Sequence, residues 1–506
     1  MIPQVWNSDR RLVPRWRSLR LTIAGRELAS SIPLEARHNS GVLPPSILEK
    51  LYHWRRDNNI ISAGELVEAA LVEGMEGEAI GAARFLLSET STATTPLRRL
   101  AALALKRAGH DEDLPAGLEI HQITEKRIWR QRTRLLPQSA LAWVELALME
   151  LVGGDKKASY RSMLVALTLS PNNRHVLRSA ARLFLHLEDP ERAYSLIATN
   201  AATPSDPWLI AAELSLCELA KKKPKFYRNG LRLADEKAML PRQLTELAGA
   251  LGTLELISGK RKRARDFFQA SLIDPTGNAV AQAEWASPEF NIELVSRQRI
   301  GQISDAEEAH TFHLIRENNL QSVAEACWKW SDTEPYSIRP FEVGVIVSAY
   351  IGNYSTALKF ADTGLLIRAE AAKLLNGRAF SLANLGRLDE AEKSLRGVSE
   401  SDEGSFLIAQ ANRGLIALRR GNIDEGKRFY NKAIDGFKKQ NALRNEAVAR
   451  AYFAREAARA GLPEATFLIK IARADVEKYS PGHMRIIEEA NSSLNDSPKP
   501  VPIGFH

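Results

Sequence analysis

Glycine recurs at a regular interval in the C-terminal half of the chain, between runs whose apolar residues have helical spacing. The recurring glycines are Gly352, Gly386 and Gly421, and a small residue follows each of them by five positions: Ala357, Ala391 and Gly426. A glycine at the end of one helix can adopt the left-handed conformation that reverses the chain. A small residue beyond it lets the two helices of a hairpin cross closely. The interval therefore predicts helix hairpins that repeat about every 34 residues.

The rest of the chain agrees with this prediction. Pro137 and Pro171 are separated by the same interval, and Trp143 opens the helical run between them. Segments with the two-residue period of a strand are nearly absent, and the weak candidates are LRLTIAG (19–25) and FNIELV (290–295). We therefore expect an all-α protein.

These spacings resemble the tetratricopeptide repeat, a helix–turn–helix unit with small or aromatic residues at fixed positions. The matches are strongest in three consecutive copies: Phe341, Gly352, Tyr354, Ala357, Gly364 and Leu365 in 338–371; Leu375, Ala379, Leu382, Gly386, Ala391 and Leu395 in 372–405; Asn412, Gly414, Gly421, Gly426, Tyr430 and Ala433 in 407–440. Copies at 140–173 and 244–275 match less well, with Ser159 and Arg263 at the small position, and a fainter copy lies at 305–336. The resemblance implies an α-solenoid, a right-handed superhelix whose concave face is lined by the first helix of each hairpin.

The repeat pattern divides the chain into five regions. We expect a divergent helical N-terminal region or cap in 1–115 and a divergent array with a basic patch in 116–290. A hinge is expected in 291–305, a regular array in 306–481, and the end of a C-terminal helix with a tail in 482–506.

No apolar run approaches the ~20 residues of a membrane helix, no secretion signal is evident, and the chain has two cysteines, Cys217 and Cys327. We expect a cytoplasmic protein without a membrane partner.

Motifs for chemistry are weak. GNIDEGKR (421–428) approaches a phosphate-binding loop, but Arg428 stands where that loop needs Ser or Thr, and the repeat already explains both glycines. His310 and His313 have the spacing of two zinc ligands on a helix but lack an evident third ligand. Cys217 and Cys327 lie in apolar runs, where buried structural thiols are typical. We therefore predict a protein that is not an enzyme and holds no cofactor or metal.

The resemblance also assigns a partner groove. The family's groove positions fall on these residues: Arg339, Glu342, Tyr350, Lys373, Asn376, Phe380, Asn384 and Arg419. Cations, amides and aromatics in this mixture suit an acidic or amphipathic segment of a partner protein. The alternative interpretation is that some of them only line a solvated trough.

A second candidate surface is basic. Residues 221–265 contain 13 Lys or Arg against four acids, which accounts for the net charge of +8. An acidic protein face or a nucleic acid would bind such a patch, whereas a merely solvated helix surface is the alternative. In KRIWRQRTR (126–134), Trp129 has the spacing of a core aromatic, with base stacking as the weaker alternative. The patch comprises Lys221, Lys222, Lys223, Lys225, Arg228, Lys260, Arg261, Lys262, Arg263 and Arg265.

Two functional hypotheses follow. The first is a non-catalytic scaffold or adaptor that binds a partner protein or peptide in the groove. Bacterial tetratricopeptide proteins often regulate a separately encoded enzyme in this way, and the resemblance extends that expectation to this chain as a regulatory subunit. The second is a helical-repeat protein that binds nucleic acid through 221–265. A catalytic role ranks last because no constellation of residues supports it.

Overall fold

The computed structural model describes residues 43, 45–88, 91–114, 122–235, 239–290, 293–303, 306–334 and 336–496. No strand occurs among these residues, and the prediction of an all-α protein is confirmed. The first strand candidate, 19–25, lies outside the described residues; in the second, Phe290 ends a helix and residues 293–295 form no strand.

The described residues form two compact units, and the division falls between Leu251 and Gly252, inside helix α13 (Pro241–Ile257). The hinge expected in 291–305, like the other expected region boundaries, remains a prediction. No helix in the described part of the chain has both the length and the apolar character that a membrane crossing demands.

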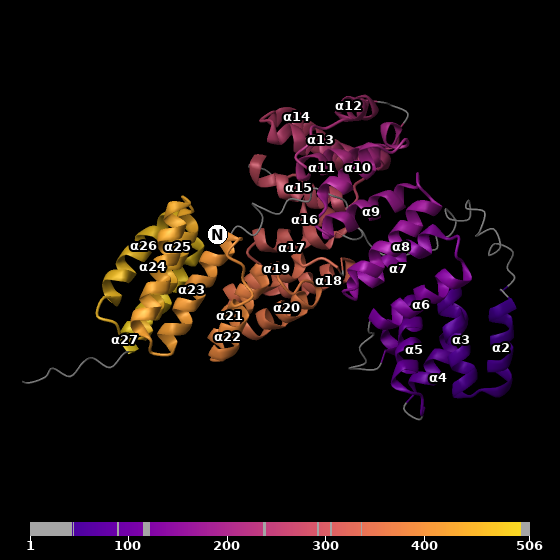
Figure 1. The fold of residues 1–506 in the computed structure, drawn as a ribbon, viewed down its shortest axis with the longest axis horizontal. Helices are drawn as coiled ribbons and strands as arrows, with labels where there is room; N and C mark the ends of the chain where they lie inside the picture. The colour runs from indigo at the N-terminus through magenta and orange to yellow at the C-terminus, as the bar shows by residue number, and fades with distance from the viewer. Residues whose placement is uncertain are drawn as a thin grey trace, which may run out of the picture. The chain divides into compact units, whose positions relative to one another are not determined.

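The helices of the first unit follow one another as antiparallel neighbours (Figure 1). They are α2 (Pro45–Asp57), α3 (Ile60–Glu73), α4 (Ile80–Leu87), α5 (Thr95–Ala108), α6 (Gln122–Leu135), α7 (Ala140–Val152), α8 (Lys156–Leu169), α9 (Arg174–His186), α10 (Pro190–Ala198), α11 (Pro207–Leu219) and α12 (Tyr227–Asp235).

The second unit continues the same pattern beyond α13 (Figure 1). Its helices are α14 (Arg261–Ser271), α15 (Gly277–Phe290), α16 (Arg297–Gly301), α17 (Glu307–Arg316), α18 (Val323–Thr333), α19 (Arg339–Tyr350), α20 (Tyr354–Ile367), α21 (Ala372–Asn384), α22 (Leu388–Leu395), α23 (Glu403–Arg419), α24 (Ile423–Lys439), α25 (Leu443–Arg459), α26 (Ala465–Tyr479) and α27 (Met484–Asp496). We call α15, α17, α19, α21, α23 and α25 first helices, and α27 takes the same place after the last hairpin.

The repeated glycines form the hairpin turns that the sequence predicts. Gly386 and Gly421 have φ values of +81° and +82°, in the left-handed region. After Gly421, the Asn422 N–H donates to the carbonyl oxygen of Ala417 at 2.9 Å, which caps the end of α23. The stretch 421–428 is thus a helix hairpin, and its Lys427 pairs with Glu464 at 2.5 Å.

Small residues lie where the paired helices cross. Ala357 and Ala391 are fully buried. A Cβ added to Gly414 would lie 2.6 Å from the ring of Tyr430, and one added to Gly426 would lie 2.6 Å from Leu418. Because real Cβ atoms do not approach so closely, these positions require glycine for packing.

Some turns have the same left-handed conformation at a residue other than glycine. Glu188, Lys221, Asn318 and Asn441 have φ values of 65°, 53°, 59° and 55°. Each is followed by the same capping bond: the Asp189 N–H, for example, donates to the carbonyl oxygen of Phe184 at 2.9 Å. The pairs α9–α10 and α11–α12 were missed because their left-handed residue is not glycine.

Candidate binding face of the C-terminal hairpins

The predicted groove residues lie on α19, α21 and α23, and their charged members have partners within the chain. Arg339 pairs with Glu308 of α17 at 2.7 Å, and its guanidinium lies 5.4 Å from the ring centre of Trp330. Lys373 pairs with Glu342 at 3.5 Å. These cations therefore connect neighbouring first helices.

The two pairs belong to a series that we call the charge ladder. It also includes Glu284 of α15 and Arg316 of α17, whose charged atoms lie 2.6 Å apart. In each rung the acid precedes its basic partner by roughly the length of one repeat. Sequence analysis missed the ladder, although acids and bases recurring at this interval were the available signal. The ladder joins α15, α17, α19 and α21 in turn.

The uncharged groove residues also contact other parts of the chain. Asn376 is 5% exposed; its Nδ2 donates to the carbonyl oxygen of Ser405 at 2.9 Å. The ring of Phe380 meets the edge of Tyr452, on α25, with 5.2 Å between centroids. Since α25 belongs to the second hairpin after α21, the first helices lie close together at this point of the face. Asn384 donates to the carbonyl oxygen of Phe380 at 2.8 Å.

Tyr350 contacts the short turn just before α27, which lies far along the chain from α19. Its hydroxyl donates to the carbonyl oxygen of Gly482, and its ring meets His483 edge-on at 5.6 Å between centroids. Burial and the charge of Arg444 lower the pKa of His483 to about 4, so its ring is neutral at pH 7. Arg485 donates to the carbonyl oxygen of Tyr350 at 2.5 Å. The end of α19 is thus bound to the start of α27.

Arg419, the last predicted groove residue, is saturated by internal hydrogen bonds. Its Nε donates to Glu456 at 2.8 Å, its Nη1 to the carbonyl oxygen of Ala383 at 2.6 Å, and its Nη2 to Asn384 at 2.9 Å. A substitution here would remove structural bonds, so Arg419 is a poor probe of partner binding. The groove as a ligand site remains a prediction.

Arg419 belongs to a group of charged side chains that the sequence analysis did not identify. We call this group the arginine cluster, and it consists of Arg419, Arg455, Arg459, Arg485, Glu456 and Glu489. Glu456 accepts from Arg419 and lies 2.8 Å from Arg455 and 3.3 Å from Arg459. Glu489 lies 3.1 Å from Arg455 and 3.2 Å from Arg485. Four guanidinium groups therefore share two carboxylates across α23, α25 and α27.

The electrostatics of the cluster follow from this imbalance. Burial alone would raise the pKa of Glu456, but the hydrogen bond from Arg419 and the charge of Arg455 outweigh it and lower that pKa. Burial and the like charge of Arg455 lower the pKa of Arg459. The side chains of Arg459 and Arg485 are 41% and 48% exposed, whereas Arg455 is 2% exposed. The excess positive charge thus faces solvent through Arg459 and Arg485.

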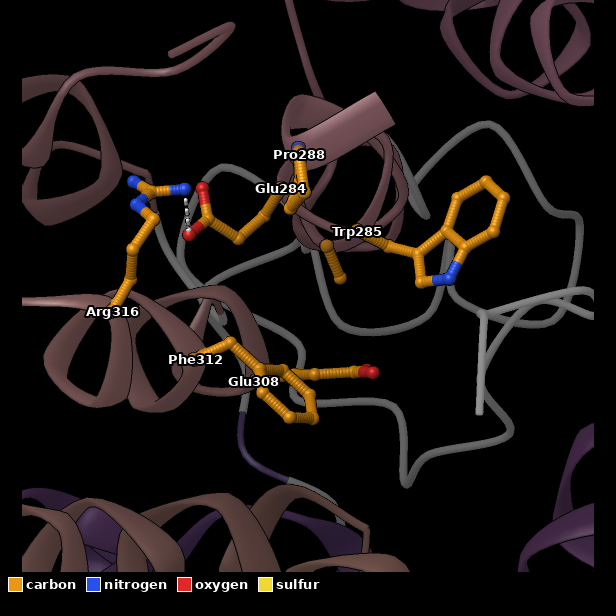
Figure 2. Close-up of a pocket in the computed structure, with 7 residues that line it drawn as sticks. Glu284, Trp285, Pro288, Glu308, Phe312 and Arg316 are labelled. Atoms are coloured by element: carbon orange, nitrogen blue, oxygen red, sulfur yellow. Dashed lines mark ion pairs between the residues drawn. The ribbon is translucent and has the colours of Figure 1, made fainter. Parts of the chain in front are cut away.

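A small cavity of about 20 Å³ lies at the other end of the ladder, between α15 and α17 (Figure 2). Glu284, Trp285, Pro288 and Ala281 of α15 line it together with Glu308, Phe312 and Arg316 of α17. Burial raises the pKa of Glu284 to about 7, against the opposing charge of Arg316. One oxygen of Glu284 pairs with Arg316, and the other, Oε2, is buried without a hydrogen-bond partner.

The basic patch predicted in 221–265 is divided between the two units. Lys221 to Arg228 belong to the unit that ends at Leu251, and Lys260 to Arg265 to the unit that begins at Gly252. Nucleic-acid binding by this segment remains a prediction.

Several cations of the basic patch have partners within the chain. Lys222 pairs with Glu191 at 3.2 Å, and Lys260 and Arg263 pair with the buried Glu255 at 3.2 and 3.3 Å. The side-chain nitrogen of Lys225 donates to the carbonyl oxygen of Ala198 at 2.8 Å. Residues exposed to solvent include Lys221, Lys223, Arg228, Lys262 and Arg265.

The other candidate residues lie in structural environments. Arg132 covers the Trp129 ring at 4.5 Å and donates to the carbonyl oxygen of Leu71 at 2.8 Å, so 126–134 contributes to packing. Burial raises the pKa of Cys217 to about 11 and also raises that of Cys327.

His313 is 2% exposed, with its Nδ1 2.9 Å from a guanidinium nitrogen of Arg316. Within the described ranges, three metal-ligating side chains come together at His110, Glu112 and Asp113 rather than around His313. Asp113 there already pairs with Arg84 at 2.7 Å.

Comparison with solved structures finds similar chains. The crystal structure of the APC/C hetero-tetramer Cut9–Hcn1 aligns with a TM-score of 0.40 and 12% identity, over 93% of this chain and 93% of that chain. The crystal structure of yeast Tom70 aligns with a TM-score of 0.33 and 12% identity, over 87% of this chain and 96% of that chain. No family model and no curated protein matches the sequence. The hairpins and turns described above are those of an all-α helical-repeat protein, and they resemble the tetratricopeptide repeat.

Proposed function

We propose that this chain is a non-catalytic interaction scaffold that binds an acidic segment of a partner protein at the arginine cluster. The observation that carries the proposal is the charge imbalance: four guanidinium groups share two carboxylates, and two of the four are nearly half exposed. A carboxylate from a partner would supply the missing negative charge through charge-assisted hydrogen bonds. Helical-repeat proteins of this architecture commonly bind partners on the face of their first helices.

The proposed binding site lies on α25 and α27, beyond the groove on α19, α21 and α23 that the sequence predicted. Arg339, Glu342, Lys373 and Arg419 are committed to contacts between first helices. Arg459 and Arg485 are partly exposed beside them. An acidic partner segment would therefore contact Arg459 of α25 and Arg485 of α27.

A neutralising double variant tests the proposal. Arg459→Gln with Arg485→Gln would leave two guanidinium groups facing two carboxylates. The matched control, Lys470→Gln with Arg473→Gln, removes two exposed cations from α26. Binding of a fluorescent hexaglutamate peptide, followed by anisotropy at low salt, should weaken about tenfold or more in the first variant and little in the control.

Equal binding by both variants would refute the proposed site. The same pair of variants, used in affinity purification from the native cell, would identify the partner if the site is upheld: proteins captured by the control and lost by the cluster variant are the candidates. Circular dichroism at 222 nm should be unchanged in both variants, since neither replaces the buried Arg455 or Glu456. Because Arg485 also donates to the carbonyl oxygen of Tyr350, Arg459→Gln alone is measured as well, and it should weaken peptide binding while that bond stays intact.

A further inference from the structure

The two exposed guanidinium groups of the arginine cluster converge on one carboxylate. Glu489 of α27 lies 3.2 Å from Arg485, on the same helix, and 3.8 Å from Arg459 of α25. Because a single carboxylate stands in ion contact with both groups, the fold holds them close to one point. A ligand that carries its charge on one small group can therefore contact both.

Both guanidinium groups retain hydrogen-bond donors for such a ligand. Each guanidinium group has five N–H donors. Among the described residues, Arg459 donates one hydrogen bond, from Nη1 to Glu456 at 3.3 Å, and Arg485 donates one, from Nη2 to the carbonyl oxygen of Tyr350 at 2.5 Å. The Nε of Arg485 faces Glu489 at 3.2 Å. Most of the donors are therefore available to an acceptor that has several oxygens.

The charge of the cluster matches a dianion. Four guanidinium groups and two carboxylates leave an excess of two positive charges, and the exposed Glu488 of α27 lies outside this set of ion pairs. Burial and the like charge of Arg455 lower the pKa of Arg459, a repulsion that an anion would relieve. One carboxylate or one phosphodiester supplies a single negative charge. A phosphomonoester supplies about two at pH 7, with three acceptor oxygens.

We propose that the partner segment carries a phosphorylated side chain, whose phosphomonoester dianion bridges Arg459 and Arg485. This inference rests on the proposed function, because it names the anion that the same site takes. The planar guanidinium fork matches phosphate geometry and binds it through paired hydrogen bonds. Glu489 keeps its ion pair with the buried Arg455 at 3.1 Å, so its carboxylate still has a partner when the phosphate engages the two exposed groups.

The phosphate ligand predicts a pH dependence that a carboxylate ligand would not show. The second pKa of a phosphomonoester is about 6, so about a quarter of it is dianionic at pH 5.5 and nearly all at pH 7.5. Glutamate side chains of a peptide, with a pKa of about 4.3, stay ionised over this interval. The pKa of His483 is lowered to about 4 by burial and the charge of Arg444, so this ring stays neutral. The charged groups that face the site are Arg419 of α23, Arg455, Glu456 and Arg459 of α25, and Arg485, Glu488 and Glu489 of α27.

The test compares the fluorescent hexaglutamate peptide with a version in which phosphoserine replaces one central glutamate, on the full chain at low salt. At pH 7.5 the phosphoserine peptide should bind about tenfold more tightly, and at pH 5.5 this advantage should shrink about fourfold. Arg459→Gln should remove most of the advantage, and Arg459→Gln with Arg485→Gln should remove all of it. The control, Lys470→Gln with Arg473→Gln on α26, should keep it.

The outcomes separate failure of this inference from failure of the site. If the double cluster variant loses hexaglutamate binding but phosphoserine adds no affinity to the native chain, the site takes carboxylates and the phosphate inference is overturned. If both peptides bind that variant as they bind the native chain, the proposed site itself is refuted. Displacement of the phosphoserine peptide by an equal concentration of a six-nucleotide DNA strand, or of inorganic phosphate, would assign the anion to another source and would also overturn the inference.

Discussion

The charge ladder and the arginine cluster lie on the first helices and α27 of the same unit, but they balance charge differently. In the ladder, each acid of one first helix meets one base of the next, as in Glu308 with Arg339 at 2.7 Å. In the cluster, two carboxylates serve four guanidinium groups. A balanced pair satisfies itself and fixes the spacing of two helices. An unbalanced group retains a net charge that a ligand can neutralise. The comparison therefore separates charges that hold the array together from charges available to a partner.

The largest expected effect concerns the centre of the cluster. Glu456 is 1% exposed and contacts three of the four guanidinium groups, including the buried Arg455. Glu456→Gln would leave buried positive charge uncompensated, so we expect a loss of about 3–5 kcal/mol in the free energy of unfolding. Urea denaturation measures it. Glu390→Gln is the control, since its pair with Arg387 is solvent-exposed and should contribute little. Equal stability of the two variants would show that the cluster is not a structural unit.

The second-largest expected effect is a pH dependence of the unfolding free energy that comes from Glu284, the first acid of the charge ladder. The pKa of Glu284 is about 7 in the folded chain and 4.5 ordinarily, so the folded chain holds this proton more tightly. The resulting stabilisation is complete below pH 4.5 and is lost as pH rises through 7, a change of about 3 kcal/mol. The difference in unfolding free energy between the native chain and Glu284→Gln should follow this curve. A difference that is constant from pH 4.5 to pH 8 would contradict the buried position of Glu284. Taking the difference cancels the opposite contributions of His175 and His483, whose pKa values are lowered to about 4 by burial.

The smallest effect is expected at the exposed rung of the ladder. Lys373 is 47% exposed and lies 3.5 Å from Glu342. Lys373→Met should therefore lower the unfolding free energy by less than about 1 kcal/mol, because water screens this pair. A thermal melt compared with that of the native chain is sufficient. A loss of unfolding free energy as large as that of Glu456→Gln would mean that exposed and buried ion pairs stabilise the fold equally. The contrast between the charge ladder and the arginine cluster would then fail.

The hairpins could be predicted from the sequence where glycine marks the turn. Gly352, Gly386 and Gly421 identified turns because few other residues adopt a positive φ readily. The same reasoning overlooked Glu188 and Lys221, which adopt that conformation despite their side chains. In those hairpins the packing of α9 on α10 and of α11 on α12 holds the turn in its left-handed conformation. No residue type in the sequence marks the turn in advance.

The candidate site was less predictable than the fold. The family positions led to Arg419, which lies in the arginine cluster, but they did not reveal Arg459, Arg485 or the carboxylates that these share. Those residues belong to α25 and α27, where the repeat is longer than in the preceding copies and the register of the motif no longer applies. The cavity around Glu284 lies in a region where the repeat is faint.

By itself, the sequence determined the local features of this protein: helical periodicity, the positive-φ turns at glycine and the small residues at helix crossings. These depend on steric limits that act within about one repeat of chain. Only the tertiary structure decided which charges neutralise one another, because partners such as Arg419 and Glu456 belong to different hairpins and meet through the stacking of one hairpin on the next. It also brought Tyr350 against Gly482, since the stacking of whole hairpins, rather than any local preference, decides which distant segments meet.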